Sequence, residues 1–269
     1  MEHRTLGSTG LKVSILGFGG IPIKDVPEHE AVEVVNRALD LGIDFVHTSI
    51  TYGDSAYKIG KVMVDRRDDC ALAVKIGGSE RTAEEAGGRL SETLEALNTD
   101  HAEIAELPVN AEGFPKAMGK GGAYEALQRA RDEGVIDHIG ITSHDVDFLE
   151  GAITTGKFSN VVMPFNYAAS SAREGLIGSA RRMGLGIIAM KVLGKGGLPM
   201  PSRALRYVLG HEIDTAIVGM NKVSEVEENI KTACELRKLT TGEIAELETM
   251  AEDIIRSDRL SSSGAVRRK

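Results

Sequence analysis

The sequence contains no tryptophan, only two cysteines and no long apolar run. Cys70 and Cys234 cannot build a disulfide framework and have no partners at metal-site spacing, so we expect a reducing cytoplasm and no metal centre. No apolar stretch approaches the length needed to cross a bilayer, and the charged, turn-rich opening "MEHRTLGSTG" is unlike a signal peptide. The sequence therefore predicts no membrane association.

Basic charge is also scarce. Lysine and arginine total 32 against 40 acidic residues, which gives a formal net charge of −8 and an isoelectric point near 5.5. Binding to nucleic acid needs a basic stripe that neutralises phosphates, and the terminal run "VRRK" is typical of a solvated tail instead. We therefore do not expect nucleic acid as a partner.

The chain of 269 residues is 42% hydrophobic and 27% charged, and it alternates regularly between strand-like and helix-like segments. Apolar, β-branched runs occupy 14–16, 43–47, 71–76, 103–107, 138–142, 160–164, 186–191 and 215–218. Amphipathic segments with helical spacing lie between them, at 30–41, 82–97, 123–133, 147–155, 172–183, 202–209 and 223–236. Eight strands alternating with helices predict a (β/α)8 TIM barrel. A doubly wound sheet is disfavoured, because "GFGG" at 17–20 lacks the third glycine of a dinucleotide-binding turn.

The two ends of the chain do not follow this repeat. Two short extended runs around Gly7 and Gly10 predict a β-hairpin that caps the bottom of the barrel. Near the C-terminus, 241–256 reads as one extra helix, with Thr240 or Thr241 as N-cap and Glu243 completing a capping box. We expect a single barrel domain over 1–269, with 260–269 as a flexible tail.

Five stretches occur in order over roughly residues 1–236. They are "HRTLGSTGLKVSILGFGG", "GIDFVHTSITYGDS", "GVIDHIGITSH", "GLGIIAMKVLGKGG" and "IVGMNKVSEVEENI". In this order and spacing they resemble the aldo-keto reductase family. The resemblance implies a (β/α)8 barrel that binds a nicotinamide cofactor in extended form and reduces a small aldehyde or ketone to an alcohol.

The family's catalytic tetrad is a tyrosine, a lysine, an aspartate and a histidine, and the resemblance finds only half of it here. Tyr52 in "TYGDS" matches the tyrosine, and Lys75 in "LAVKIG" matches the lysine. His47 stands at the aspartate position, and Pro108 stands at the histidine position. The sequence therefore predicts an oxidoreductase with an altered active site.

Tyr52 and Lys75 retain the proton-donating half of carbonyl reduction. A phenol has an ordinary pKa of about 10, and a neighbouring ammonium lowers it by stabilising the phenolate. Glu106 lies two residues before Pro108 on the same strand face, where it either pairs with Lys75 or reaches water at a strand irregularity. His47 either carries the proton or fills space as a neutral ring that accepts a hydrogen bond from Lys75.

By the same resemblance, the nicotinamide end of the cofactor lies over the strand ends. Ser143 and His144 match side chains that hold the carboxamide, and Met190 matches the residue against the nicotinamide ring. The family's glutamine at this site falls at Val162 or Met163, which offer no amide. The other contacts expected here are Gly20 and the pyrophosphate-covering residues Lys191, Leu193 and Gly194.

The adenosine end of the cofactor matches "VGMNKVSEVEENI". The matched residues are Gly219, Lys222, Ser224, Glu225, Glu228 and Asn229. Glu225 stands where the family often has a basic residue for the 2′-phosphate, and a carboxylate repels a phosphate but accepts from a free ribose hydroxyl. NADP(H) or NAD(H) is therefore the expected cofactor, with NADP(H) disfavoured by Glu225.

Three functions remain open from the sequence. Tyr52 and Lys75 favour a nicotinamide-dependent reductase. The missing aspartate and histidine favour a cofactor-binding protein without efficient turnover, such as a redox sensor or a partner-binding subunit. An isomerase or lyase that uses the barrel mouth is the third, because this fold supports many chemistries.

Overall fold

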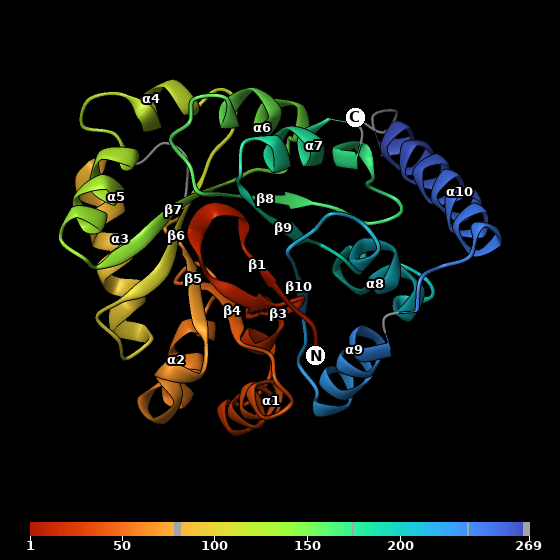
Figure 1. The fold of residues 1–269 in the computed structure, drawn as a ribbon, viewed down its shortest axis with the longest axis horizontal. Helices are drawn as coiled ribbons and strands as arrows, with labels where there is room; N and C mark the ends of the chain where they lie inside the picture. The colour runs from red at the N-terminus through yellow and green to blue at the C-terminus, as the bar shows by residue number, and fades with distance from the viewer. Residues whose placement is uncertain (78–81, 174, 236, 266–269) are drawn as a thin grey trace.

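Eight parallel strands close into a barrel in the order β10-β3-β4-β5-β6-β7-β8-β9, with helices around the outside (Figure 1). The computed structural model describes residues 1–77, 82–173, 175–235 and 237–265. The strands are β3 (Leu16–Gly19), β4 (Phe45–Ser49), β5 (Ala71–Lys75), β6 (Ala102–Pro108), β7 (Ile136–Thr142), β8 (Asn160–Pro164), β9 (Gly186–Met190) and β10 (Thr215–Gly219). The predicted (β/α)8 barrel is confirmed.

The helices follow the strands along the chain. They are α1 (Glu28–Asp40), α2 (Ser55–Arg66), α3 (Ala83–Ala96), α4 (Phe114–Met118), α5 (Ala123–Asp132), α6 (Val146–Ile153), α7 (Leu176–Arg182), α8 (Pro201–Leu209), α9 (Val223–Glu235) and α10 (Thr241–Ala265). Short 3-10 turns are η1 (Gly7–Thr9), η2 (Ile21–Asp25), η3 (Arg67–Asp69), η4 (Ser171–Arg173) and η5 (Gly194–Gly196). The predicted helical segment 172–183 is thus divided into η4 and α7, and α4 forms within the long segment after β6.

The first barrel strand begins later than predicted. Residues 12–14 belong to the hairpin, and "LGFG" at 16–19 forms β3 although its glycines suggest a loop. A Cβ on Gly17 would lie 2.9 Å from the ring of Phe45, so the glycine makes room for a large side chain inside the barrel.

The hairpin of β1 (His3–Thr5) and β2 (Lys12–Ser14) closes the N-terminal end of the barrel, which faces the viewer in Figure 1. Its Leu6 and Val13 are fully buried among side chains of the barrel interior. The Ser8 amide donates to the Gly184 carbonyl at 2.7 Å. The predicted N-terminal hairpin is therefore present, and its apolar side chains fill the base of the barrel.

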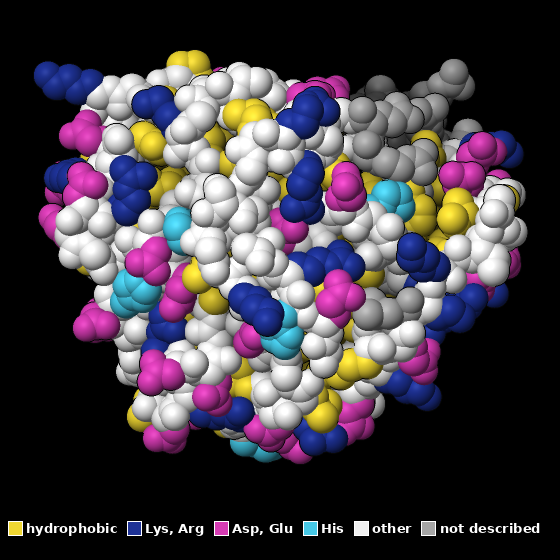
Figure 2. Space-filling view, in the orientation of Figure 1, with side chains coloured by type: hydrophobic (Ala, Val, Ile, Leu, Met, Phe, Trp, Pro, Cys, Tyr) yellow, Lys and Arg dark blue, Asp and Glu magenta, His cyan; other side chains and the backbone are white. Residues whose placement is uncertain are grey.

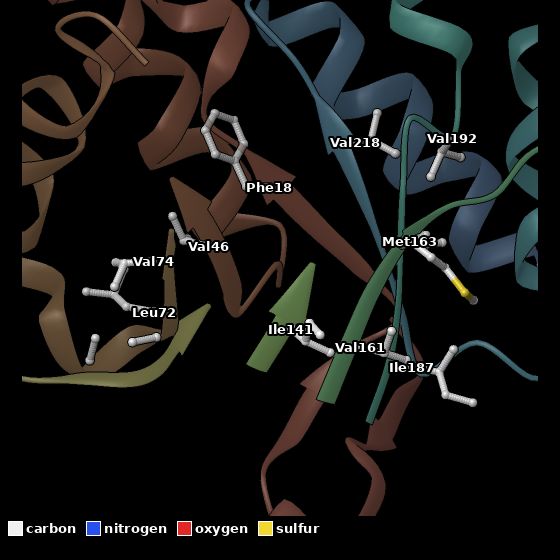
Figure 3. Close-up of a cluster of buried hydrophobic side chains, with 14 of the residues drawn as sticks. Phe18, Val46, Leu72, Val74, Ile141, Val161, Met163, Ile187, Val192 and Val218 are labelled. Atoms are coloured by element: carbon white, nitrogen blue, oxygen red, sulfur yellow. The ribbon is translucent and has the colours of Figure 1, made fainter. Parts of the chain in front are cut away.

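Alternation along each strand produces two apolar layers. Residues of one parity point outward and pack between the barrel and the helices, as the labelled side chains of Figure 3 show for Phe18, Val46, Leu72 and others. Residues of the other parity form a smaller interior cluster that includes Phe45, Ile104 and Ile188. Only the interior set can reach the site at the open end of the barrel.

The strand register divides the interior side chains into levels of four, contributed by alternate strands. Near the C-terminal ends, one level holds Gly19, Lys75, Thr142 and Met190, and the level beneath it holds His47, Glu106, Val162 and Ile217. Below them lie Gly17, Ala73, Gly140 and Ile188, and then Phe45, Ile104, Asn160 and Thr215. Charged side chains therefore enter the barrel at two successive levels.

The last helix is longer than predicted. Thr240 caps it, because its hydroxyl accepts from the Glu243 amide at 3.3 Å while its own amide donates to the Glu243 carboxylate at 2.9 Å. The helix continues to Ala265 and so includes 260–265, and no proline interrupts this run. Residues 266–269 of the predicted tail lie outside the described residues.

The surface carries charge of both signs. On the face that bears the hairpin, acidic and basic side chains are interspersed (Figure 2). Within the described part of the chain, the search for a helix long and apolar enough to cross a membrane finds none.

Candidate active site

The turn after β4 brings Tyr52 beside the open end of the barrel. The Tyr52 amide donates to the Ser49 carbonyl at 3.0 Å, and the Ser49 hydroxyl donates to the Lys75 carbonyl at 2.9 Å. Gly53 follows with φ of +60°, a left-handed conformation that glycine adopts without strain. The Tyr52 ring thereby lies 6.4 Å from the His47 ring, centroid to centroid.

His47 and Glu106 form a buried pair inside the barrel. The His47 imidazole Nε2 donates to Glu106 Oε2 at 3.0 Å, and the residues are only 4% and 0% exposed. Glu106 therefore does not reach water, and it bonds to His47 rather than to Lys75. The reason is the register, because His47 and Glu106 share one interior level whereas Lys75 belongs to the next.

Lys75 lies on β5, between the strands that carry the pair. It is in register with Glu106 on β6, but no ion pair joins the two side chains in the described structure. The ammonium Nζ instead lies 3.9 Å from the Met190 sulfur. Burial lowers the pKa of Lys75, and the negative charge of Glu106 acts in the opposite direction.

Tyr52 is held in its protonated form. Burial raises its pKa, and the charge of Glu106 raises it further. The lowering expected from a neighbouring ammonium is not found in this arrangement, because the interior carboxylate and desolvation dominate. Tyr52 is thus a phenol that can donate a hydrogen bond or a proton to an oxygen that gains negative charge.

Cationic side chains gather at the ends of β7 and β9. Burial and then the charges of Lys195 and Lys75 lower the pKa of Lys191. Partial burial and then the charges of Lys191, Lys75 and Lys195 lower the pKa of His144. Ser143 is buried beside His144, and its hydroxyl accepts from the Asp145 amide at 3.2 Å. These mutually repelling groups favour an anion at the barrel mouth.

Lys195 is a member of this cluster that sequence reasoning missed. The fragment "GKGG" after Leu193 carried the signal, because a lysine among glycines in a loop over the strand ends is free to face a ligand. Lys195 itself adopts φ of 59°, within the turn η5.

The loop after β9 is fixed by its own hydrogen bonds. Lys191 has φ of 56°, and its carbonyl accepts from Asn166 Nδ2 at 2.8 Å and from the Gly194 amide at 2.9 Å. Gly194 has φ of +55°, and a Cβ there would lie 2.6 Å from Leu198 Cγ. Leu193 packs against the outer core. The predicted pyrophosphate-covering residues therefore form one ordered turn.

The two predicted cofactor glycines lie at close backbone contacts. A Cβ on Gly219 would lie 2.7 Å from Pro22 Cγ, and one on Gly20 would lie 2.7 Å from Ser55 Oγ. The Gly20 carbonyl also accepts from Ser55 Oγ at 2.7 Å. Packing between neighbouring loops is sufficient to explain both glycines.

The remaining predicted residues lie just before α9 and in its first two turns. Glu225 Oε2 accepts from the Asn221 amide at 2.9 Å, so this carboxylate folds back over the start of the helix. Asn229 is buried, whereas Lys222, Ser224 and Glu228 are exposed. Gly219 and these residues therefore form a second group, next to the end of β10 and separate from the His47 and Glu106 pair.

Comparison with known proteins places this barrel in a family. Residues 15–200 match the profile of the Aldo/keto reductase family. The chain belongs to that family. Membership of this family makes the protein an oxidoreductase. The resemblance found in its sequence motifs is confirmed.

Relatives of this aldo/keto reductase cover nearly the whole chain. L-galactose dehydrogenase of Arabidopsis thaliana is 28% identical, over 94% of this chain and 95% of that protein. The structure of aldo-keto reductase AKR11C1 from Bacillus halodurans, in its holo form, superposes with a TM-score of 0.80 at 21% identity, over 93% of this chain and 96% of that one. An aldo/keto reductase of Klebsiella pneumoniae in complex with NADP and acetate has the same TM-score of 0.80 at 16% identity, over 93% and 96%. The last two likenesses show the fold.

Proposed function

We propose that this protein reduces a small aldehyde or ketone to an alcohol with NADH or NADPH, and that Tyr52 donates the proton. The observation that carries the proposal is the buried Glu106 carboxylate, which bonds His47 and lies in register with Lys75. Its charge acts on both Lys75 and Tyr52. The four side chains thus supply a phenol, an ammonium, a carboxylate and an imidazole around one end of the barrel.

The residues of the barrel mouth fit a nicotinamide cofactor. Lys191 and Lys195 form no ion pair among the described residues, and their mutual repulsion is relieved by an anion such as a pyrophosphate. Met190, 9% exposed beside Lys75, offers a thioether surface for a flat ring. Ser143 and His144 supply polar atoms for a carboxamide.

In the proposed reaction, Tyr52 hydrogen-bonds the carbonyl oxygen and donates its phenolic proton as that oxygen becomes an alkoxide. A nicotinamide cofactor held by the residues of the barrel mouth would supply the hydride that the carbonyl carbon gains. Lys75 stabilises the phenolate left on Tyr52 until a proton returns from water. Glu106 acts as the counter-charge of Lys75 from the level below, and His47 holds Glu106 in place.

Glu225 acts on the choice between the two cofactors. Its carboxylate lies at the start of α9, on the Asn221 amide, where it repels a 2′-phosphate and accepts from a ribose hydroxyl. The Klebsiella pneumoniae neighbour was crystallised with NADP, and in this chain we expect Glu225 to weaken binding of NADPH rather than remove it.

The substrate is a small carbonyl compound. Because L-galactose dehydrogenase is a relative of this chain, the first assay panel should include a sugar aldehyde.

The cysteines support a cytoplasmic, reducing location. Both are unpaired, Cys70 buried and Cys234 exposed.

A second candidate is a cofactor-binding protein without efficient turnover. It is favoured by Pro108, which cannot donate a hydrogen bond to a substrate carbonyl, and by the engagement of the His47 Nε2 with Glu106. Both candidates are tested by titrating the purified protein with NADH and NADPH by fluorescence, and then following cofactor oxidation with aliphatic aldehydes, aromatic aldehydes and aldoses. Binding with turnover supports the reductase, and binding without turnover supports the sensor. No binding of either cofactor at millimolar concentration contradicts both.

A further inference from the structure

The barrel interior contains polar side-chain atoms without a protein partner, both at the level of His47 and Glu106 and below it. Among the described residues, buried side-chain atoms lacking any hydrogen bond include Glu106 Oε1, both amide atoms of Asn160, and Thr215 Oγ1. Asn160 and Thr215 are fully buried. A buried amide with neither its donor nor its acceptor satisfied is costly, and internal water is the usual partner of such groups.

Glu106 and Asn160 face each other across a glycine. The register pairs Glu106 with Gly140 on β7, and pairs Gly140 with Asn160 on β8. A Cβ on Gly140 would lie 2.5 Å from Asn160 Oδ1 and 2.6 Å from Nδ2, so the amide lies over this glycine, on the side of β6. Adjacent strands are about 4.8 Å apart, which leaves the amide and the free carboxylate oxygen within reach of one bridging molecule.

We propose that an ordered water molecule lies inside the barrel, donates to Glu106 Oε1, and is held by the Asn160 amide above Gly140. Water fits because it both donates and accepts, as the carboxylate and the two amide atoms together require. Gly140 is needed because any side chain would displace the Asn160 amide. Asn160 is thus a positioning residue that acts on the reaction through the water and Glu106.

This role deepens the proposed function and rests on it, because a fixed Glu106 matters for turnover only if Lys75 and Tyr52 perform reduction. With one oxygen bonded to His47 and the other to the water, the carboxylate cannot rotate away from the level beneath Lys75. Its charge then stays where Lys75 requires it during the proton transfer.

The test combines a high-resolution crystal structure with turnover by four variants. The electron density should show a water within hydrogen-bond distance of Glu106 Oε1 and the Asn160 amide. Asn160→Leu, which removes the amide at similar volume, and Gly140→Ala, which displaces it, should each lower kcat about tenfold, the effect of losing one hydrogen bond to a charged group. The dissociation constant for NADH should stay within about twofold, because neither residue lies at the mouth.

Two comparisons separate positioning from a general structural effect. Asn160→Ser should recover most of the lost kcat, because its hydroxyl can still hold a water. Thr215→Val removes another unpartnered interior group at the same level, close to where a Cβ of Gly17 would lie and away from Glu106, and should leave kcat unchanged. Absence of the water from well-ordered density, or wild-type kcat in Asn160→Leu, would overturn the inference. If the wild-type protein binds cofactor but reduces no carbonyl, the proposed function fails, while the density still decides whether the water exists.

Discussion

Replacement of Glu106 by glutamine tests the charge balance of the interior most directly. The substitution keeps the side-chain volume and removes one negative charge from a position that is 0% exposed. His47 loses the carboxylate that it bonds at 3.0 Å, and Lys75 loses the nearest negative charge that acts on it. His47 and Lys75 stay buried in the variant, so water does not compensate for the lost negative charge.

The expected destabilisation is about 3–5 kcal/mol, the range found when one member of a buried charged pair is removed. For a chain of this size, such a loss lowers Tm by roughly 6–20 °C. The same change should lower kcat, because Lys75 becomes less able to remain charged beside Tyr52.

The loss should depend on pH in a defined direction. Burial lowers the pKa of Lys75 from its ordinary 10.5, so the folded protein binds this proton less tightly than the unfolded chain does. Stability from this residue therefore rises as pH rises through the folded-state pKa. Removing Glu106 lowers that pKa further, which adds a penalty at neutral pH that disappears once Lys75 is neutral in both folded proteins. The Tm deficit of Glu106→Gln should therefore be smaller at about pH 10 than at about pH 7.

The assay is thermal unfolding of wild type and variant at both pH values, together with kcat for one carbonyl substrate. Glu103→Gln is the matched control, because Glu103 is on the same strand but partly exposed, and it accepts from Arg67 at 2.9 Å on the outside of the barrel. It should lower Tm by only roughly 2–4 °C, with kcat unchanged. A Glu106→Gln variant with wild-type Tm at neutral pH, or with a deficit that grows toward alkaline pH, would refute the reasoning.

Three further predictions concern the site. Tyr52→Phe should abolish carbonyl reduction while cofactor affinity stays within a few-fold, because it removes only the phenolic proton; if it retains activity and His47→Ala loses it, His47 is the proton carrier. Glu225→Arg should shift the ratio of NADPH to NADH dissociation constants toward NADPH by replacing repulsion with attraction, and an unchanged ratio in calorimetric titration would show that Glu225 does not face the ribose. Turnover of simple aldehydes should fall below about 10 per second, the ordinary enzyme median, because Pro108 offers no hydrogen bond to the carbonyl; a panel reaching that rate would contradict the importance of this loss.

The fold could be predicted because its signal repeats eight times. Every barrel strand except β3 carries β-branched residues, and a helix with one apolar face follows along the chain, so errors at single boundaries do not change the topology. The error at β3 has a local cause, because the glycines of "GFGG" usually mark a turn but here give space to Phe45. The early end predicted for α10 has a different cause, because serines near a terminus usually indicate that a helix frays.

The candidate site could be predicted in part. Parity along β6 was sufficient to place Glu106 on the same face as Pro108, and the motifs placed Tyr52 and Lys75. The partner of Glu106 could not be predicted, because it depends on how far each strand is shifted relative to its neighbours, which the sequence does not specify. Asn160 was missed for a similar reason, since the sequence places it in the strand run 160–164 but only the register places it opposite Gly140.

The same register explains how the acid and the imidazole can each lie on the strand that carries the other one in the family pattern. β4 and β6 both flank β5, so a carboxylate on either strand lies one level below Lys75 and can oppose its charge. The family resemblance places the acid at position 47 and the imidazole at 108, whereas this chain has His47 on β4 and Glu106 on β6. The number of charges around Lys75 is then conserved, but the imidazole is directed into the barrel and bonded to Glu106 rather than toward a substrate. If these side chains act as we propose, charge balance around Lys75 and orientation of the carbonyl are separable here, and we expect this chain to retain the first and to lose the second.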